Sequence, residues 1–154
     1  MTPVSLTRAN IAALAVPAAL MAGALGSQYI GGLYPCEMCY WQRWPHDAAI
    51  GLAILAFFVK PPARTILIVL AAVAILISGG IGVFHAGVEY RWWEGLTTCS
   101  NTAQGGSLAD IMNAPLIRCD VPQWTLGGIS LAGFNALFST LGGLTILAML
   151  RRAK

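Results

Sequence analysis

The chain has 154 residues, of which 57% are hydrophobic and 10% charged, with a net charge of +3 and a mean hydropathy of +0.71. A soluble domain carries about a quarter charged residues, so these charges are too few to cover a water-facing surface, and membrane lipid is the expected solvent. The sequence has no basic patch, no phosphate-binding glycine loop and no internal repeat, which argues against a nucleic-acid partner. The length suits a single membrane domain, residues 1–154.

Four apolar stretches predict transmembrane helices at about residues 11–32, 39–59, 65–88 and 125–150. A bilayer core of roughly 30 Å needs about 20 helical residues to cross. Arg8 ahead of an apolar run that ends in small residues also permits a cleaved signal peptide. We prefer an uncleaved helix because it pairs better with the stretches that follow. The predicted fold class is an all-α membrane protein, a four-transmembrane-helix bundle with a long periplasmic loop between helices 3 and 4.

The second stretch is the most informative, because its purely apolar part, Ala48 to Val59, is too short to span a membrane. To reach spanning length the helix must begin near Cys39 and include Arg43. The Cys36-x-x-Cys39 motif therefore belongs to the mouth of a membrane helix, at the membrane surface.

The charges predict the orientation. Six of the nine Lys and Arg residues lie on one side if both termini are cytoplasmic, as the positive-inside rule requires: Arg8, Lys60, Arg64, Arg151, Arg152 and Lys154. All six acidic residues and all four cysteines then lie outside. The outer loop runs over about residues 89–123, where Ser107 to Asp110 resembles a helix start, although a packed turn remains equally open.

The even number of cysteines on the outer face indicates two bridges, since disulfides persist outside a bacterial inner membrane. The natural pairs are Cys36 with Cys39 and Cys99 with Cys119, because each pair lies on one continuous outer segment. A Cys36–Cys39 bridge closes a very small loop and would stabilise the fold little. A Cys-x-x-Cys pair is instead common as a redox dithiol.

The spacing of these cysteines suits other uses less well. A zinc site commonly takes two close pairs, whereas only Cys36 and Cys39 are close, so no metal site is predicted. Haem attachment requires a histidine after the motif, and Tyr40 stands there instead. Two inert structural disulfides, or a metal-handling membrane protein, remain as alternatives to a redox relay.

Two further residues are candidates for binding an electron acceptor. Arg43 lies four residues beyond Cys39, one helical turn away, where it could stabilise a Cys39 thiolate and donate to an anionic oxygen; lipid headgroups are its alternative partner. His85, near the outer end of the third helix, could donate to the same acceptor. Because the sequence has no flavin or nicotinamide motif, the predicted acceptor is a lipid-soluble quinone.

The chain resembles the DsbB family of bacterial disulfide-generating membrane proteins over nearly its whole length. The resemblance lies in Pro35-Cys36-Glu37-Met38-Cys39, Gln42-Arg43, Pro45, His85-Ala-Gly-Val-Glu89, Cys99, Cys119, Pro122-Gln123-Trp124 and Ser130-Leu-Ala-Gly-Phe-Asn135. The combination of Cys-x-x-Cys, Gln-Arg and a second outer cysteine pair is specific, while His85 and Asn135 are weaker matches.

The resemblance implies a thiol:quinone oxidoreductase in the inner membrane that oxidises a periplasmic DsbA-like protein. Cys99 would form the mixed disulfide with that partner, and Cys119 would resolve it and then attack Cys36. Cys39 would face ubiquinone or menaquinone, with Arg43 and His85 binding the quinone. Only two residues separate Cys119 from Pro122, a shorter segment than in well-known members. A vitamin-K-reductase-like enzyme is the alternative with similar chemistry.

Overall fold

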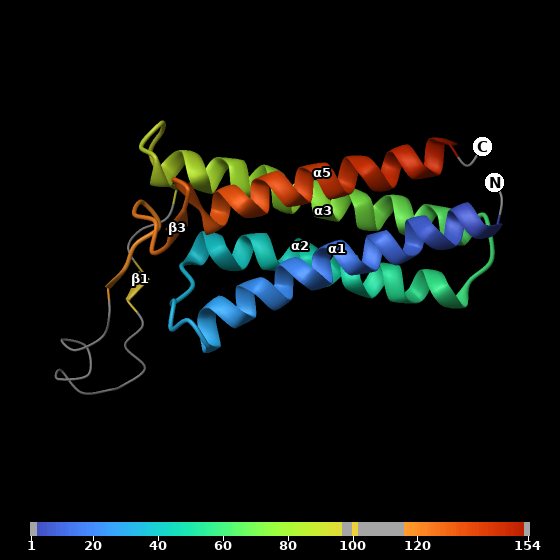
Figure 1. Cartoon of the computed structure of the whole chain (residues 1–154), viewed down its shortest axis with the longest axis horizontal. Coiled ribbons are helices and arrows are strands. Elements are labelled where there is room, and N and C mark those ends of the chain that lie inside the picture. The colour runs from blue at the N-terminus through green and yellow to red at the C-terminus, as the bar shows by residue number, and fades with distance from the viewer. Residues whose placement is uncertain (1–2, 97–99, 102–115, 153–154) are drawn as a thin grey trace.

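A computed structural model describes residues 3–96, 100–101 and 116–152. Its helices are α1 (Pro3–Tyr29), α2 (Glu37–Phe58), α3 (Ala63–Glu89) and α5 (Leu131–Arg152). Figure 1 shows them side by side, with the start of α1 and the end of α5 at the same end of the bundle. The opposite end carries two short antiparallel strand pairs, β1 (Ser100–Asn101) with β2 (Leu116–Ile117) and β3 (Thr125–Leu126) with β4 (Ile129–Ser130).

Three of these helices are long and apolar enough to cross a membrane by length and composition, over Ser5–Tyr29, Ala63–Glu89 and Leu131–Arg152. The chain is therefore a helical membrane protein. α2 has 22 residues but includes Glu37, Arg43 and Asp47, and it is not among those three. Its crossing stays a prediction.

The bundle is packed through small side chains. α3 makes extensive contact with both α2 and α5, while α1 covers α2 and α5. Small residues let membrane helices approach closely, and they make up much of the larger buried core, which comprises Leu6, Ala9, Ala13, Ala49, Ala53, Ala56, Ile68, Ala71, Ala72, Ile75, Ile146 and Leu150. This core lies toward the end of the bundle that carries the two termini, which leaves the opposite end for polar groups.

The cysteine motif begins α2. Cys36 is the N-cap residue, with an extended backbone, and its carbonyl accepts from the Tyr40 amide at 3.3 Å. Cys39 therefore lies in the first helical turn, where unpaired amides give the helix end a partial positive charge.

The last helix begins at Leu131, later than the apolar run from Thr125 predicted. Gly127 and Gly128 have φ values of 59° and 81°, which a two-residue hairpin turn of the primed type requires and which suit glycine. Ser130 then caps the helix, because its Oγ accepts from the Gly133 amide at 3.1 Å. The short helix considered at Ser107 lies outside the described residues.

Candidate functional site

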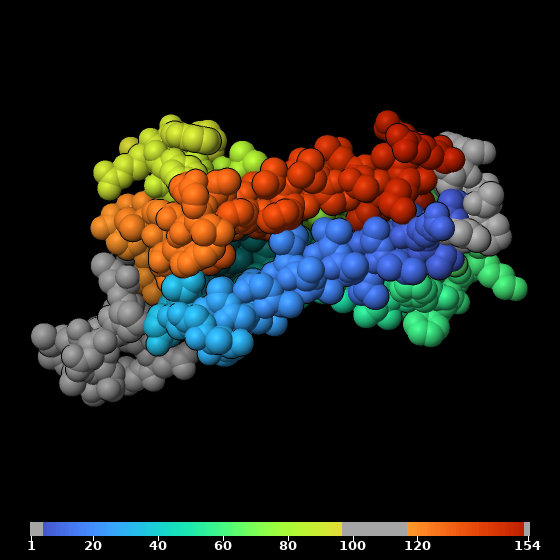
Figure 2. Space-filling view, viewed as in Figure 1, coloured from blue at the N-terminus to red at the C-terminus, as the bar shows by residue number. Residues whose placement is uncertain are grey.

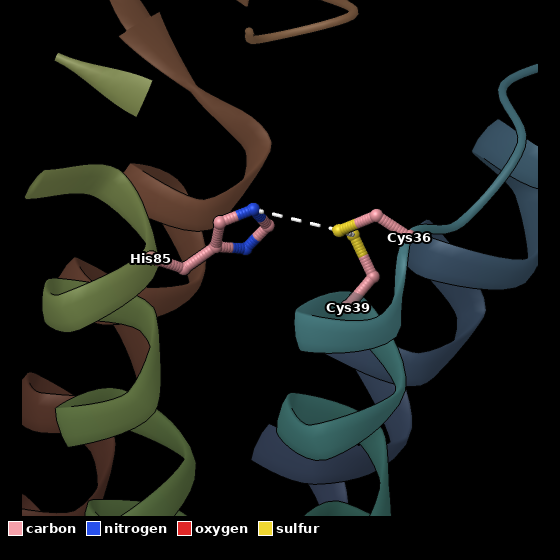
Figure 3. A group of neighbouring side chains, drawn as sticks. All are labelled: Cys36, Cys39 and His85. Carbon is pink, nitrogen blue, oxygen red and sulfur yellow. Dashed lines mark hydrogen bonds between the residues drawn. The ribbon is translucent and has the colours of Figure 1, made fainter. Parts of the chain in front are cut away.

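Cys36 and Cys39 lie together at the mouth of α2. Their Sγ atoms are 3.2 Å apart, a contact between two thiols, since a disulfide bond measures about 2.05 Å. Cys36 is buried, with 2% of its surface exposed, whereas Cys39 is half-buried. Figure 3 shows both sulfur atoms turned toward α3, from which a histidine ring approaches.

That ring is His85. Its Nε2 lies 3.5 Å from the Cys36 sulfur, and its Nδ1 lies 2.8 Å from the Gln42 side-chain nitrogen. Glu89, one turn along α3, places a carboxylate oxygen 3.8 Å from the same Nε2. The ring predicted to bind an electron acceptor therefore lies against the first cysteine of the motif.

Cys119 reaches the same place from the segment that precedes α5. It is 6% exposed and packs in a small buried cluster with Cys36, Met38, Val88 and Ile117. Hydrogen bonds to Cys119 and to Cys39, together with burial, raise the pKa of the Cys36 thiol above its ordinary value. The structure thus brings Cys119 against Cys36. Cys99, its predicted partner, lies outside the described residues.

Arg43 lies one turn beyond Cys39, as its spacing predicts, and contacts α1. Its guanidinium donates to the Gln28 side-chain oxygen at 2.6 Å and to the Ala24 carbonyl at 3.2 Å. It also lies over the Tyr40 ring, 5.4 Å from its centre. A cation held in this way is fixed in position beside the cysteine motif.

A cavity of about 400 Å³ opens beside these groups. Figure 2 shows the molecule hollowed between α1 and α5, with α2 behind them. Its wall is largely apolar, with Leu20, Met21, Phe134 and Phe138 among its residues, and its polar residues include Cys36, Cys39, Gln42, Arg43 and His85. A concave apolar site with a few converging polar groups is typical of small-molecule binding.

A buried polar network extends from this site between α2, α3 and α5. Asn135 donates to the Gln42 side-chain oxygen at 2.8 Å, and its own oxygen lies 2.9 Å from His46 Nε2. Ser139 donates to that oxygen at 2.8 Å, and Ser78 lies 2.9 Å from the same His46 nitrogen.

No prediction from the sequence concerned this network, although Asn135 belongs to the weaker part of the family resemblance. A signal was present, because polar residues within membrane helices usually face the bundle interior. The spacing of four residues between Gln42 and His46, and again between Asn135 and Ser139, places each pair on one helix face.

One arrangement favours the metal alternative. Ligand atoms of Cys36, Cys39 and His85 all lie within 4.8 Å of one another. Thiolate and imidazole are the ligands that zinc prefers, so the ligand types alone fit a zinc site.

A match to a known protein family shows what kind of protein carries this site. Residues 7–149 match the family model described as "Disulfide bond formation protein DsbB". The chain belongs to the DsbB family. The resemblance found in the sequence is therefore confirmed, and the chain is a membrane thiol oxidoreductase of disulfide bond formation.

Individual relatives agree with this family. "Disulfide bond formation protein B" of Verminephrobacter eiseniae is 33% identical, over 87% of this chain and 80% of that protein. A protein of the same name from an Acidovorax species is 27% identical, over 87% of this chain and 81% of its own length. An uncharacterized protein of Rickettsia prowazekii is 25% identical, over 84% and 79% of the two chains. No solved structure matches the chain.

Proposed function

We propose that this DsbB-family protein oxidises a periplasmic DsbA-like dithiol protein and passes the electrons through Cys99/Cys119 and then Cys36/Cys39 to a membrane quinone. The observation that carries the proposal is the meeting of Cys119, Cys36 and Cys39 beside an apolar cavity. Cys36 is in contact with the loop cysteine, while the less buried Cys39 lines the cavity.

Each thiol–disulfide exchange step forms one S–S bond and breaks another. The partner's thiolate attacks Cys99 of the Cys99–Cys119 disulfide, and Cys119 leaves as a thiolate when the mixed disulfide forms. The second thiol of the partner then attacks the first, which releases Cys99 and leaves the partner oxidised. Cys119 thiolate attacks Cys36 of the Cys36–Cys39 disulfide and expels Cys39 thiolate. Attack of Cys99 on Cys119 closes the loop disulfide again and leaves Cys36 and Cys39 reduced.

The first turn of α2 favours the thiolate that Cys39 becomes when it leaves. Amides at a helix N-terminus stabilise a negative charge, and Cys39 lies in that turn. The proposed role of Cys39 as the leaving group, and then as the cysteine that faces the acceptor, agrees with this position.

The residues around the cavity suit a quinone. A quinone would accept two electrons and two protons from the reduced pair, which regenerates the Cys36–Cys39 disulfide. Arg43 offers N–H donors of the kind that a quinone oxygen accepts, His85 lines the same cavity as the second proposed contact, and the apolar wall from α1 and α5 suits the quinone ring. A DsbA-like donor has a potential of about −120 mV, so its oxidation requires a strong final acceptor.

The hydrogen bonds of His85 support thiol chemistry over metal binding. A histidine that binds metal through one ring nitrogen normally donates its other N–H to an acceptor. The second nitrogen of His85 faces the amide nitrogen of Gln42 at 2.8 Å, and this group is a donor. The cysteine–histidine cluster therefore lacks the surrounding bond that a zinc site needs.

The proposed location is the bacterial inner membrane, with four crossings and both termini in the cytoplasm. α2 has 22 residues, which gives a length of about 33 Å at 1.5 Å per residue, enough for a hydrocarbon core of about 30 Å. Its charged residues lie in its first half, close to the end at which the cysteines meet.

The test is donor oxidation by the purified protein. A reduced DsbA-like protein should lose its thiols only when ubiquinone or menaquinone is added, and the absorbance of the oxidised quinone should fall in step. Cys39→Ser should abolish both signals, whereas Ser5→Ala, a change of similar size at the far end of α1, should leave them intact. Stoichiometric bound zinc without quinone-dependent thiol oxidation would favour the metal-binding alternative.

A further inference from the structure

Two amide side chains, the buried Gln42 on α2 and the half-buried Asn135 on α5, have orientations that the backbone fixes. The Gln42 Nε2 lies 3.1 Å from the Met38 carbonyl oxygen, and the Asn135 Nδ2 lies 3.1 Å from the Ser78 carbonyl oxygen. A carbonyl oxygen only accepts hydrogen bonds. Each amide must therefore present its nitrogen, and not its oxygen, at these contacts.

The orientation of Gln42 determines where His85 carries its proton. The same Gln42 nitrogen lies 2.8 Å from His85 Nδ1, so Nδ1 has to accept. A neutral imidazole has one N–H, which then belongs to Nε2. Nε2 is the atom that lies 3.5 Å from the Cys36 sulfur, as the dashed line in Figure 3 marks.

Asn135 holds Gln42 in this orientation. It donates to the Gln42 side-chain oxygen at 2.8 Å, while its own oxygen accepts from Ser139 at 2.8 Å and lies 2.9 Å from His46 Nε2. Turning the Gln42 amide over would place its oxygen against the Met38 carbonyl and its nitrogen against the Asn135 nitrogen. Buried mismatches of this kind are costly, so α5 constrains His85 through Gln42.

We propose that Gln42 and Asn135 are positioning residues that keep the His85 proton on Nε2, directed at the Cys36 sulfur. The inference rests on the proposed function, in which Cys36 becomes a thiolate when the Cys36–Cys119 bond breaks. The electron pair of that bond stays on the Cys36 sulfur, and the Nε2–H donates to the new charge. The other tautomer would direct a lone pair at the thiolate and repel it.

The chain suits a direct measurement, because it has two histidines. In reduced protein labelled with ¹⁵N-histidine, NMR distinguishes a protonated from a bare ring nitrogen, and His85→Gln assigns the signals. We expect His85 to carry its proton on Nε2, with Nδ1 bare. Gln42→Glu replaces the amide donor by a carboxylate, and near pH 7.5 we expect Nδ1 to gain a proton. A proton on Nδ1 in the unmodified protein, or a bare Nδ1 in Gln42→Glu, would overturn the proposal.

Asn135→Leu tests the indirect part of the proposal, since Asn135 reaches His85 through Gln42 in the hydrogen bonds described above. It should introduce a second His85 tautomer and slow donor oxidation about three- to tenfold, the effect expected for losing one neutral hydrogen bond. An unchanged His85 spectrum in this variant would remove Asn135 from the positioning role.

Gln123→Glu is the matched control, because it makes the same chemical change at a glutamine that donates to the Tyr34 carbonyl. It should leave the His85 signals where they are. If the unmodified protein shows the expected tautomer but no quinone-dependent oxidation, the proposed function fails and the histidine geometry stands. If the protein is active with the opposite tautomer, only the positioning inference fails.

Discussion

The side chain of Arg43 is held by Gln28, whose side-chain oxygen accepts from the guanidinium at 2.6 Å. This bond joins the first half of α2 to the end of α1 beside the cavity. The guanidinium has five N–H donors. The bonds to Gln28 and the Ala24 carbonyl fix its plane but use only some of these donors. Arg43 is thus held at the cavity wall in a position from which it can also donate to a bound acceptor.

Replacing Arg43 by Ala should lower quinone reduction by about ten- to a hundredfold in kcat/KM, because charge-assisted hydrogen bonds contribute roughly 1.5–3 kcal/mol. Arg43→Lys should recover only part of this, since an ammonium lacks the planar fork of donors. Thiol exchange between the donor and the Cys99–Cys119 pair should be nearly unaffected. Stopped-flow assays with a quinone series would measure the two steps separately.

The control for that experiment is Gln28→Ala, which removes the contact with α1 but keeps the cation. If Gln28→Ala loses as much activity as Arg43→Ala, the effect comes from helix packing. If both variants keep normal quinone kinetics, Arg43 serves as a lipid-headgroup anchor.

Replacing Cys119 by Ala leaves Cys99 as an unpaired thiol, and its thiolate should attack the disulfide of an oxidised DsbA-like donor to form a mixed disulfide, with the second cysteine of the donor leaving as a thiolate. The adduct should appear on a non-reducing gel, and peptide mass spectrometry should locate it at Cys99. Adding Cys99→Ala should abolish it. An adduct formed through Cys36 would mean that the roles of the two pairs are wrongly assigned.

The raised pKa of Cys36 predicts how the reduced protein reacts with iodoacetamide. The thiolate is the nucleophile, so alkylation of Cys36 should have its midpoint at a higher pH than alkylation of an ordinary cysteine. The hydrogen bond to Cys119 is the largest cause of the shift, and Cys119→Ala should therefore move the midpoint to lower pH. Mass spectrometry of the Cys36 peptide across a pH series gives both midpoints. Equal midpoints in the two proteins would contradict the contact.

The sequence predicted the parts of this site that depend on local spacing. A stretch of apolar residues too short to span placed Cys39 at the mouth of a helix, and α2 begins at Glu37. The relation of Cys39 to Arg43 followed from one helical turn. The later start of α5 was also readable in principle, because Gly127 and Gly128 form a recognisable turn signal.

The remaining parts depend on how the helices pack. Gln42 and Asn135 are 93 residues apart, and no local pattern states which face of α2 meets α5. The same holds for Gln28, which became the partner of Arg43 because α1 lies against α2. Polar residues in apolar helices indicate a buried network. Which of these residues are hydrogen-bonded to one another follows only from the three-dimensional structure.

The orientation in the membrane can be tested with reporter tags. Tags at Lys154 and in the turn between Lys60 and Arg64 should be cytoplasmic, and a tag near Gly105 should be periplasmic. Protease protection in spheroplasts distinguishes the two sides. A periplasmic tag in the Lys60–Arg64 turn would show that α2 does not cross, and a mature N-terminus near Ser27 would remove the first crossing.

The last prediction concerns Gly82, where α3 and α5 approach closely beside the polar network. A Cβ at this position would lie 2.9 Å from the Ala136 nitrogen and 3.0 Å from the Ala132 carbonyl oxygen, both backbone atoms of α5. Backbone atoms cannot turn aside as a flexible side chain can, so the helices must separate. Overpacking of this kind typically costs about 1–3 kcal/mol. Gly82→Ala should therefore lower the apparent melting temperature in detergent.

The same substitution should also disturb His85, because the Asn135 side-chain nitrogen would lie 3.1 Å from the added carbon. The matched control is Gly80→Ala, two residues away on α3, where an added Cβ meets nothing within 4 Å. Alanine is the better helix former by up to about 1 kcal/mol, so this control should melt at the same temperature or slightly higher. If both variants melt like the unmodified protein, the close approach of α3 and α5 at Gly82 is not a determinant of stability, and the packing that places Asn135 beside Gln42 must come from elsewhere in the bundle.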